Sequence, residues 1–154
     1  MLLNLETDYA VRIIHVLSLF DKRIDAASVS EYSNVSLRFS LKILNKLVLG
    51  GLVKSYKGSK GGYELAKSAA EISVLNVFEV INGPLFISRC QSEYVCERKK
   101  YDDLCMFRAV FDDAAEYITD KFSAKTFYLD DETKEHMREH IKDCCNCNKK
   151  ESKV

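Results

Sequence analysis

The 154-residue chain lacks the features of several protein classes. No apolar run reaches the roughly 18 residues that a membrane-spanning helix requires. The segment Met1–Glu6 has no basic stretch followed by an apolar run, so no secretory signal is visible. Internal repeats and low-complexity tracts are also missing. Because 47% of the residues are hydrophobic and 30% are charged, we expect a folded cytoplasmic protein with no contact to membranes.

Catalytic signatures are missing as well. No Ser, His and Asp occur in an order and context that favour nucleophilic catalysis, and the chain has only three His. The glycine-rich segment 57–62 lacks the Gly-x4-Gly-Lys-Ser/Thr spacing of a phosphate-binding P-loop. We therefore predict that the protein is not an enzyme.

A net charge of zero at first argues against a polyanionic partner, but the distribution of charge reverses this. Residues 1–68 carry ten basic and six acidic side chains, whereas residues 69–154 carry thirteen and seventeen. Within residues 36–67, seven Lys and Arg accompany one acid, Glu64. Such a concentrated basic segment is the electrostatic footprint of a nucleic-acid-binding protein.

Periodicity predicts a mainly α-helical fold with one small β-hairpin. The first helix is expected over residues 7–20, with Thr7 as its N-cap and Asp8 in its first turn. The other expected helices follow the 3.6-residue period and cover residues 26–33, 36–48, 74–82, 104–122 and 131–143. Gly50-Gly51 and Gly83-Pro84 end the second and third of these. Strands are expected at 52–56 and 63–66 around the glycine-rich turn. The tail 144–154 is expected to be loose.

Three short helices followed by a hairpin are the order of a winged helix-turn-helix, in which the third helix enters a DNA major groove. Six residues on the exposed side of that helix are suited to base edges and phosphates: Ser36, Arg38, Ser40, Lys42, Asn45 and Lys46. The hairpin tip adds Lys57, Ser59 and Lys60. A basic helix alone is usually a solvated face and a Gly-rich turn alone is usually a turn, so the combination carries this prediction.

Four segments resemble the Rrf-two (Rrf2) family, which contains IscR-like and NsrR-like iron–sulfur regulators. They are Thr7-Asp8-Tyr9-Ala10-Val11-Arg12, Val35–Ser55, Lys57–Ala66 and Ile72–Leu85. The likeness covers about residues 1–123. It implies a DNA-binding domain over 1–84, a cysteine-bearing sensor loop over 85–103 and a dimerisation helix that begins at 104. From the residues alone we expect that a helical extension completes the unit 104–143 and that a Cys-rich flexible tail follows over 144–154.

The same resemblance implies a homodimeric repressor that binds a pseudo-palindromic operator in double-stranded DNA. The long helix at 104–122 would pair with a second copy. Two departures from the family concern the operator sequence: Leu41 stands where an acidic residue is frequent in the third helix, and Lys57 stands where the wing often carries Arg.

Cys90, Cys96 and Cys105 are three thiols in one poorly periodic segment before a helix. Thiolates suit zinc or an iron–sulfur cluster, and either site needs a fourth ligand. The resemblance favours a cluster, 2Fe–2S or 4Fe–4S, which air purification can remove, and points to Asp8 of the partner chain as the fourth ligand. Helix-terminal charge pairing is the alternative role for Asp8, and Glu6 or an exogenous thiol stays open as a ligand.

A second candidate metal site lies in the C-terminal extension, for which the resemblance implies nothing. His136, His140 and Cys144 recur every four residues, so a helix would place them on one face. The alternative is a solvated helix with an oxidisable tail that also holds Cys145 and Cys147.

Two other functions remain open. A winged-helix regulator without a cluster would sense a small molecule or a protein, whereas a cluster carrier or electron-transfer protein would use the cysteines and leave the basic segment unused. The sensed signal and the DNA-binding form, apo or holo, are not readable from the sequence.

Overall fold

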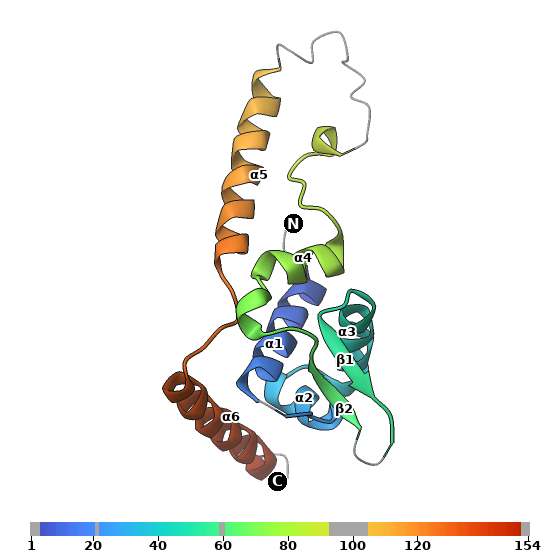
Figure 1. The fold of residues 1–154 in the computed structure, drawn as a ribbon, viewed down its shortest axis with the longest axis vertical. Helices are drawn as coiled ribbons and strands as arrows, with labels where there is room; N and C mark the ends of the chain where they lie inside the picture. The colour runs from blue at the N-terminus through green and yellow to red at the C-terminus, as the bar shows by residue number, and fades with distance from the viewer. Residues whose placement is uncertain (1–3, 21, 59–60, 93–104, 152–154) are drawn as a thin grey trace.

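The computed structural model describes residues 4–20, 22–58, 61–92 and 105–151, with the last ten residues, 142–151, described by their backbone alone. Its elements in chain order are α1 (Leu5–Leu19), α2 (Ala26–Ser33), α3 (Leu37–Leu49), β1 (Val53–Tyr56), β2 (Gly62–Leu65), η1 (Ala69–Glu71), α4 (Val74–Asn82), η2 (Arg89–Gln91), α5 (Met106–Ala124) and α6 (Asp131–Glu151). The described fold is mainly helical with one antiparallel hairpin, as predicted (Figure 1).

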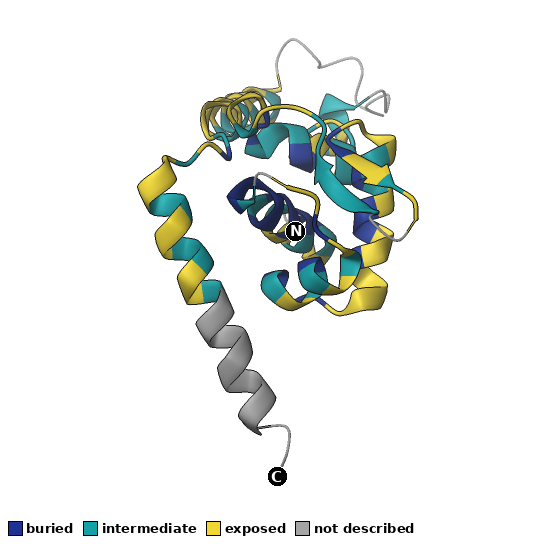
Figure 2. Ribbon diagram, turned by 60° about the horizontal axis from the view of Figure 1, so that its bottom comes forward, coloured by how far each residue is buried: buried dark blue, intermediate teal, exposed yellow. Residues whose placement is uncertain are grey.

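The core lies where α1, α2, α3 and α4 meet, as the buried parts of the ribbon indicate (Figure 2). All members of the buried cluster except Phe127 are aliphatic. Fully buried members include Ile13 and Ile14 of α1, Ile43 and Leu44 of α3, and Val77 of α4. Helical spacing places these residues on the facing sides of their helices, so burying them removes a continuous apolar surface from water.

One predicted detail of these helices is wrong. The N-cap of α1 is Asn4, whose side-chain oxygen accepts a 2.8 Å hydrogen bond from the Thr7 backbone N–H. Thr7, the predicted N-cap, lies inside the first turn and is fully buried.

An isolated β-bridge joins the hairpin to the helical core. Val53 pairs with Leu65 and Tyr56 with Gly62, and Ile24 forms a bridge to Tyr63 on the other edge of β2. Gly62 has φ +143° and its Cα faces the Ile24 carbonyl so closely that a Cβ would lie 2.7 Å from that oxygen. Glycine is therefore required where the wing meets the core.

The C-terminal half is arranged differently from the core. Helix α5 extends away from the core (Figure 1). Near its C-terminal end, the Phe122 ring contacts the Phe78 ring of α4. The chain then returns, where Phe127 donates its backbone N–H to the Ile72 carbonyl. Helix α6 packs against α1 and α2, and Arg138 donates to the Leu19 carbonyl.

The extension also contains a difference from the sequence prediction. Helix α6 continues to Glu151, so residues 144–151, expected to form a loose tail, have helical backbone. No helix in the described ranges is both long and apolar enough to cross a membrane.

Candidate nucleic-acid interface and cysteine segment

Helix α3 presents a polar, basic face beside the hairpin. Ser36 occupies the N-cap position without a side-chain capping hydrogen bond, so its hydroxyl stays available to a partner. Arg38 and Asn45 are exposed, as predicted from their spacing. These three residues lie on the part of α3 that the core does not cover.

Ser40 does not belong to this face, which corrects its place among the predicted DNA contacts. Its side chain is fully buried, and its hydroxyl donates to the Val35 carbonyl at 3.2 Å. Ser30 donates to the same carbonyl at 2.6 Å. Ser40 therefore fastens α3 to the end of α2 and has no surface to offer a base.

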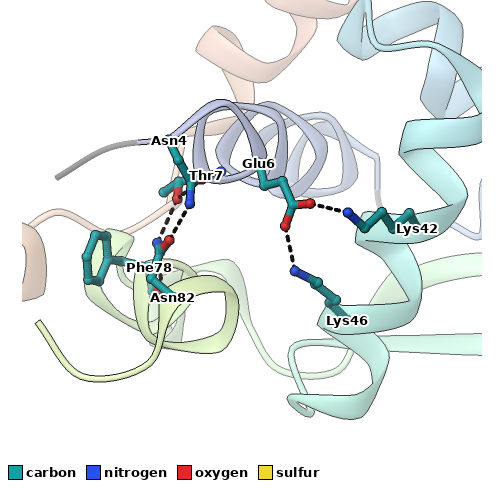
Figure 3. Close-up of polar contacts among 7 residues, drawn as sticks. All are labelled: Asn4, Glu6, Thr7, Lys42, Lys46, Phe78 and Asn82. Carbon is teal, nitrogen blue, oxygen red and sulfur yellow. Dashed lines mark hydrogen bonds and ion pairs between the residues drawn. The ribbon is translucent and has the colours of Figure 1, made fainter. Parts of the chain in front are cut away.

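Lys42 and Lys46 point toward α1 rather than straight into solvent (Figure 3). Both ammonium groups contact the carboxylate of Glu6, and the Lys46 Nζ–Glu6 Oε2 distance is 2.5 Å. The hydrogen bonds from Lys42 and then Lys46 lower the pKa of Glu6 to about 2. Glu6 thus neutralises part of the positive charge of Lys42 and Lys46, which the sequence predicted for the exposed face of α3.

The wing is only partly described. Lys57 is exposed at the end of β1, and Lys54 is exposed within that strand. Ser59 and Lys60, the other predicted contacts of the tip, lie outside the described residues. At the base of the wing, the Arg23 guanidinium lies 3.5 Å from the centroid of the Tyr56 ring and pairs with Glu64.

A second network joins the first turn of α1 to the last residue of α4 (Figure 3). The Asn82 amide donates to the Thr7 hydroxyl at 2.7 Å, and the Asn4 amide donates to the Asn82 side-chain oxygen at 2.6 Å. Because Glu6 lies in the same turn, the start of α1 holds the end of α4 on one side and α3 on the other. Sequence reasoning missed this role of Asn82, which a spacing pattern does not reveal.

The structure describes two of the three cysteines expected to bind a cluster, and these two lie on either side of the third in the sequence. Cys90 lies in η2, half-buried, with its sulfur 2.9 Å from the Ser88 hydroxyl. Cys105 is exposed at the N-cap position of α5 and makes no side-chain capping bond. Cys96 lies outside the described residues. Gln91 donates to the Phe111 carbonyl and to the Asp112 carboxylate at 2.9 Å each, which fixes η2 against α5.

Asp8 is exposed on α1 and pairs with Arg12 at 2.9 Å, one helical turn away. Its side chain is therefore on the surface, where a partner chain can reach it. Within the described residues no three His, Cys, Asp or Glu side chains gather into a metal site. The donor set that fits a cluster is the pair of thiols Cys90 and Cys105, together with Cys96 between them in sequence.

His136 and His140 lie on successive turns of α6 with their ring centroids 4.6 Å apart. The side chain of Cys144 lies outside the described part. The site expected from His136, His140 and Cys144 therefore stays a prediction, of which the structure describes the two neighbouring imidazoles.

The comparisons identify the family. A family model described as "Rrf2: Iron-dependent Transcriptional regulator" matches residues 3–131. The HTH-type transcriptional regulator IscR of Pectobacterium carotovorum (strain PC1) is 33% identical over 97 residues, which cover 63% of this chain and 57% of that relative's length.

Solved structures agree in fold. CymR, the global cysteine regulator of B. subtilis, matches with a TM-score of 0.68 at 20% identity over 82% of this chain and 93% of that one. IscR of T. potens matches with a TM-score of 0.63 at 20% identity over 88% of each chain. These relatives are transcriptional regulators and not enzymes. Since the family model covers most of its length, the chain belongs to the Rrf2 family.

Proposed function

We propose that this chain is a dimeric, sequence-specific DNA-binding repressor whose operator affinity is controlled by an iron–sulfur cluster. The observation that carries the DNA-binding part is the exposed face of α3 with Ser36, Arg38 and Asn45, set beside a cationic wing. An α-helix of this kind fits the major groove, where Arg addresses guanine and Asn addresses adenine. The wing lysines contact the phosphate backbone.

The dimer is supported by α5. None of its side chains is buried within the chain. Met106, Phe107, Val110 and Tyr117 are between 63% and 72% exposed. Such a concentration of exposed apolar side chains is typical of an interface rather than of a solvated helix. A second copy of α5 would cover them and place two recognition helices on a two-fold symmetric site.

The cluster would be held by Cys90, Cys96 and Cys105 of one subunit, with the partner's Asp8 as the fourth ligand. Bound there, it would supply a redox-sensitive and chemically labile tie between the subunits. The two hydrogen bonds from Gln91 to α5 support this proposal, because they hold η2, which contains Cys90, against the helix that begins next to Cys105. Exposure of the Asp8 carboxylate on α1 supports it as a ligand that a partner chain can reach.

The contacts drawn in Figure 3 would couple the cysteine segment to the helix that binds DNA. Asn82 ends the helix that leads into that segment, and it bonds to Thr7 in the first turn of α1. Glu6 of the same turn holds Lys42 and Lys46 of α3. A shift of this turn would move the recognition helix and its charges. A coupling free energy of about 1–3 kcal/mol is sufficient to change operator affinity by 5–150-fold.

DNA binding is tested by selecting duplexes from a randomised pool with both the reconstituted and the metal-free protein. Affinity is then measured by fluorescence anisotropy at several salt concentrations. We expect Arg38→Ala to lose about 1–3 kcal/mol of discrimination at one base pair. Lys57→Gln should instead weaken binding to all DNA sequences alike, and it should reduce the slope of log affinity against log salt concentration by about one. Lys125→Ala, an exposed cation outside α3, the wing and the cysteine segment, is the control.

The cluster is tested by anaerobic purification with visible and electron-paramagnetic spectra and with counts of iron and sulfide. Cys90→Ser should lower all of these signals, whereas Cys147→Ser should not. An unchanged spectrum and iron content in Asp8→Ala would refute Asp8 as the ligand. A colourless protein that still binds its operator would favour the regulator without a cluster. A coloured protein with no salt-dependent DNA binding would favour the cluster carrier.

The C-terminal site is proposed as a two-point chelate of a divalent transition metal by His136 and His140, whose rings are neighbours on α6. Imidazole is a preferred ligand of zinc. Titration with zinc alone should give a binding isotherm that His136→Ala weakens. An isotherm that is the same in the variant and the parent would contradict this site.

A further inference from the structure

Two leucines lie on the part of α3 that the core leaves uncovered. Leu37 is 46% exposed and Leu41 is 43% exposed. They are four residues apart, and Arg38 precedes Leu41 by three, so the three side chains share one face of the helix. Large apolar side chains therefore alternate with a cation at the position where the proposed function brings DNA.

The core does not account for these leucines. Ile43, Leu44 and Leu47 are fully buried and already fill the inward face of α3. Leu41 lies between Ser40, which is buried, and Lys42, which is turned toward Glu6. It occupies the outward side of the second turn of the helix, in the N-terminal half that meets base edges when such a helix lies in a major groove.

An isobutyl side chain can neither donate nor accept a hydrogen bond. In the major groove it leaves the polar edges of adenine, guanine and cytosine unsatisfied. Thymine alone among the four bases presents an apolar group there, its 5-methyl. Contact between Leu41 and that methyl would remove apolar surface from water on both sides.

We propose that Leu41 is a specificity-determining residue that selects thymine through its 5-methyl group, with Leu37 extending the apolar contact. This inference rests on the proposed DNA-binding function and names the chemistry that the operator must offer. The surrounding charge supports DNA as the occupant of this face, because residues 36–67 hold seven basic side chains and one acidic side chain. Arg38, beside the leucines, is suited to a neighbouring guanine.

The test removes only the methyl group. In a duplex selected by the full-length protein, each thymine is replaced in turn by deoxyuridine, which keeps base pairing and every hydrogen-bonding edge. We expect one position in each half-site at which wild-type affinity falls by about fourfold, the value of one buried methyl-sized group. In Leu41→Ala the same replacement should have no effect.

Leu49→Ala is the matched control, because Leu49 is 81% exposed at the C-terminal end of α3. It should keep the deoxyuridine penalty. Circular dichroism should show that all variants fold, as expected for exposed positions. A wild-type protein indifferent to deoxyuridine at every position, or a penalty that persists in Leu41→Ala, would overturn the inference. Failure of the proposed function is distinguishable, because the protein would then bind no duplex in a salt-dependent way.

Discussion

The two halves of the chain place their apolar side chains in opposite ways. Around α1 and α3, residues such as Ile14 and Leu44 are completely enclosed. Along α5, Phe107 and Val110 are about two-thirds exposed and no side chain is buried. The first half buries its apolar side chains when it folds, whereas the apolar side chains of α5 need a second surface to cover them. The difference indicates that the first half carries the fold and that α5 is where the proposed dimer interface would form.

The largest expected effect comes from adding a charge to the exposed apolar surface of α5. Phe107→Glu should prevent dimerisation, because a carboxylate would be buried in an apolar interface. Loss of two-site binding should lower operator affinity by about 10²–10⁴-fold. Sedimentation and anisotropy measure the two effects. Thr119→Glu adds the same charge on the side of α5 that faces away from Met106 and Val110, and it should change neither; equal effects of both variants would contradict an interface on the Met106 and Val110 side.

The next largest effect concerns stability. Leu44→Ala should lower the free energy of unfolding by about 2–5 kcal/mol, because it leaves a cavity in the enclosed core. Leu49→Ala, the same substitution at an exposed position of the same helix, should stay within about 0.5 kcal/mol of wild type. Urea denaturation measures both. Similar losses at the two positions would show that α3 is not packed as described.

A smaller effect is expected where the end of α4 is held to the first turn of α1. Asn82→Ala removes the hydrogen bonds to Thr7 and Asn4, and the buried Thr7 hydroxyl loses its donor. We expect about 1–3 kcal/mol less stability and a weaker dependence of operator affinity on cluster content. Asn76 caps α4 at its other end, so Asn76→Ala is a control that destabilises α4 without touching α1. Equal loss of coupling in both variants would contradict the route through Asn82.

Much of the fold could be predicted because its signals are local. The bounds of α2 and α4 follow from Asp25 and Ser73, which cap their helices, and from the residues that end them. The contacts of α3 were less accessible. Exposure of Arg38 follows from helical spacing, but burial of Ser40 depends on where the end of α2 lies. Periodicity gives the face of a helix and does not reveal what another element covers.

The charge of the interface was the least predictable feature. Residues 36–67 are basic by composition, yet Lys42 and Lys46 are paired with Glu6, about forty residues earlier in the chain. Nothing in the spacing of α1 indicates this partner, because ion pairs between elements depend on how the helices cross. The basic recognition face and the first turn of α1 therefore form one electrostatic unit.

The smallest expected effect is the pH dependence of stability that arises from the ion pairs of Glu6 with the two lysines. The pKa of Glu6 is lowered to about 2 by its lysine partners, from 4.5 for an unperturbed Glu. A carboxylate with a depressed pKa stabilises the folded state above its unfolded pKa and loses that contribution as pH falls through the folded value. Glu6→Gln should cost about 1 kcal/mol at pH 7, since the lysines are partly exposed to solvent. This difference from wild type should shrink between pH 4.5 and 2 and vanish below pH 2.

The same variant should alter DNA binding in the opposite direction. Freed from Glu6, Lys42 and Lys46 become available to phosphates, so the salt slope of binding should steepen by about 0.9 for each lysine that makes a new contact. Glu116→Gln, which removes an exposed charge from α5, should change neither the pH profile nor the slope. If Glu6→Gln lost stability without any change in slope, the two lysines would serve the fold alone. Glu6→Gln should therefore lower stability and strengthen DNA binding together only if the ion pairs with α1 hold Lys42 and Lys46 of α3 away from the phosphates.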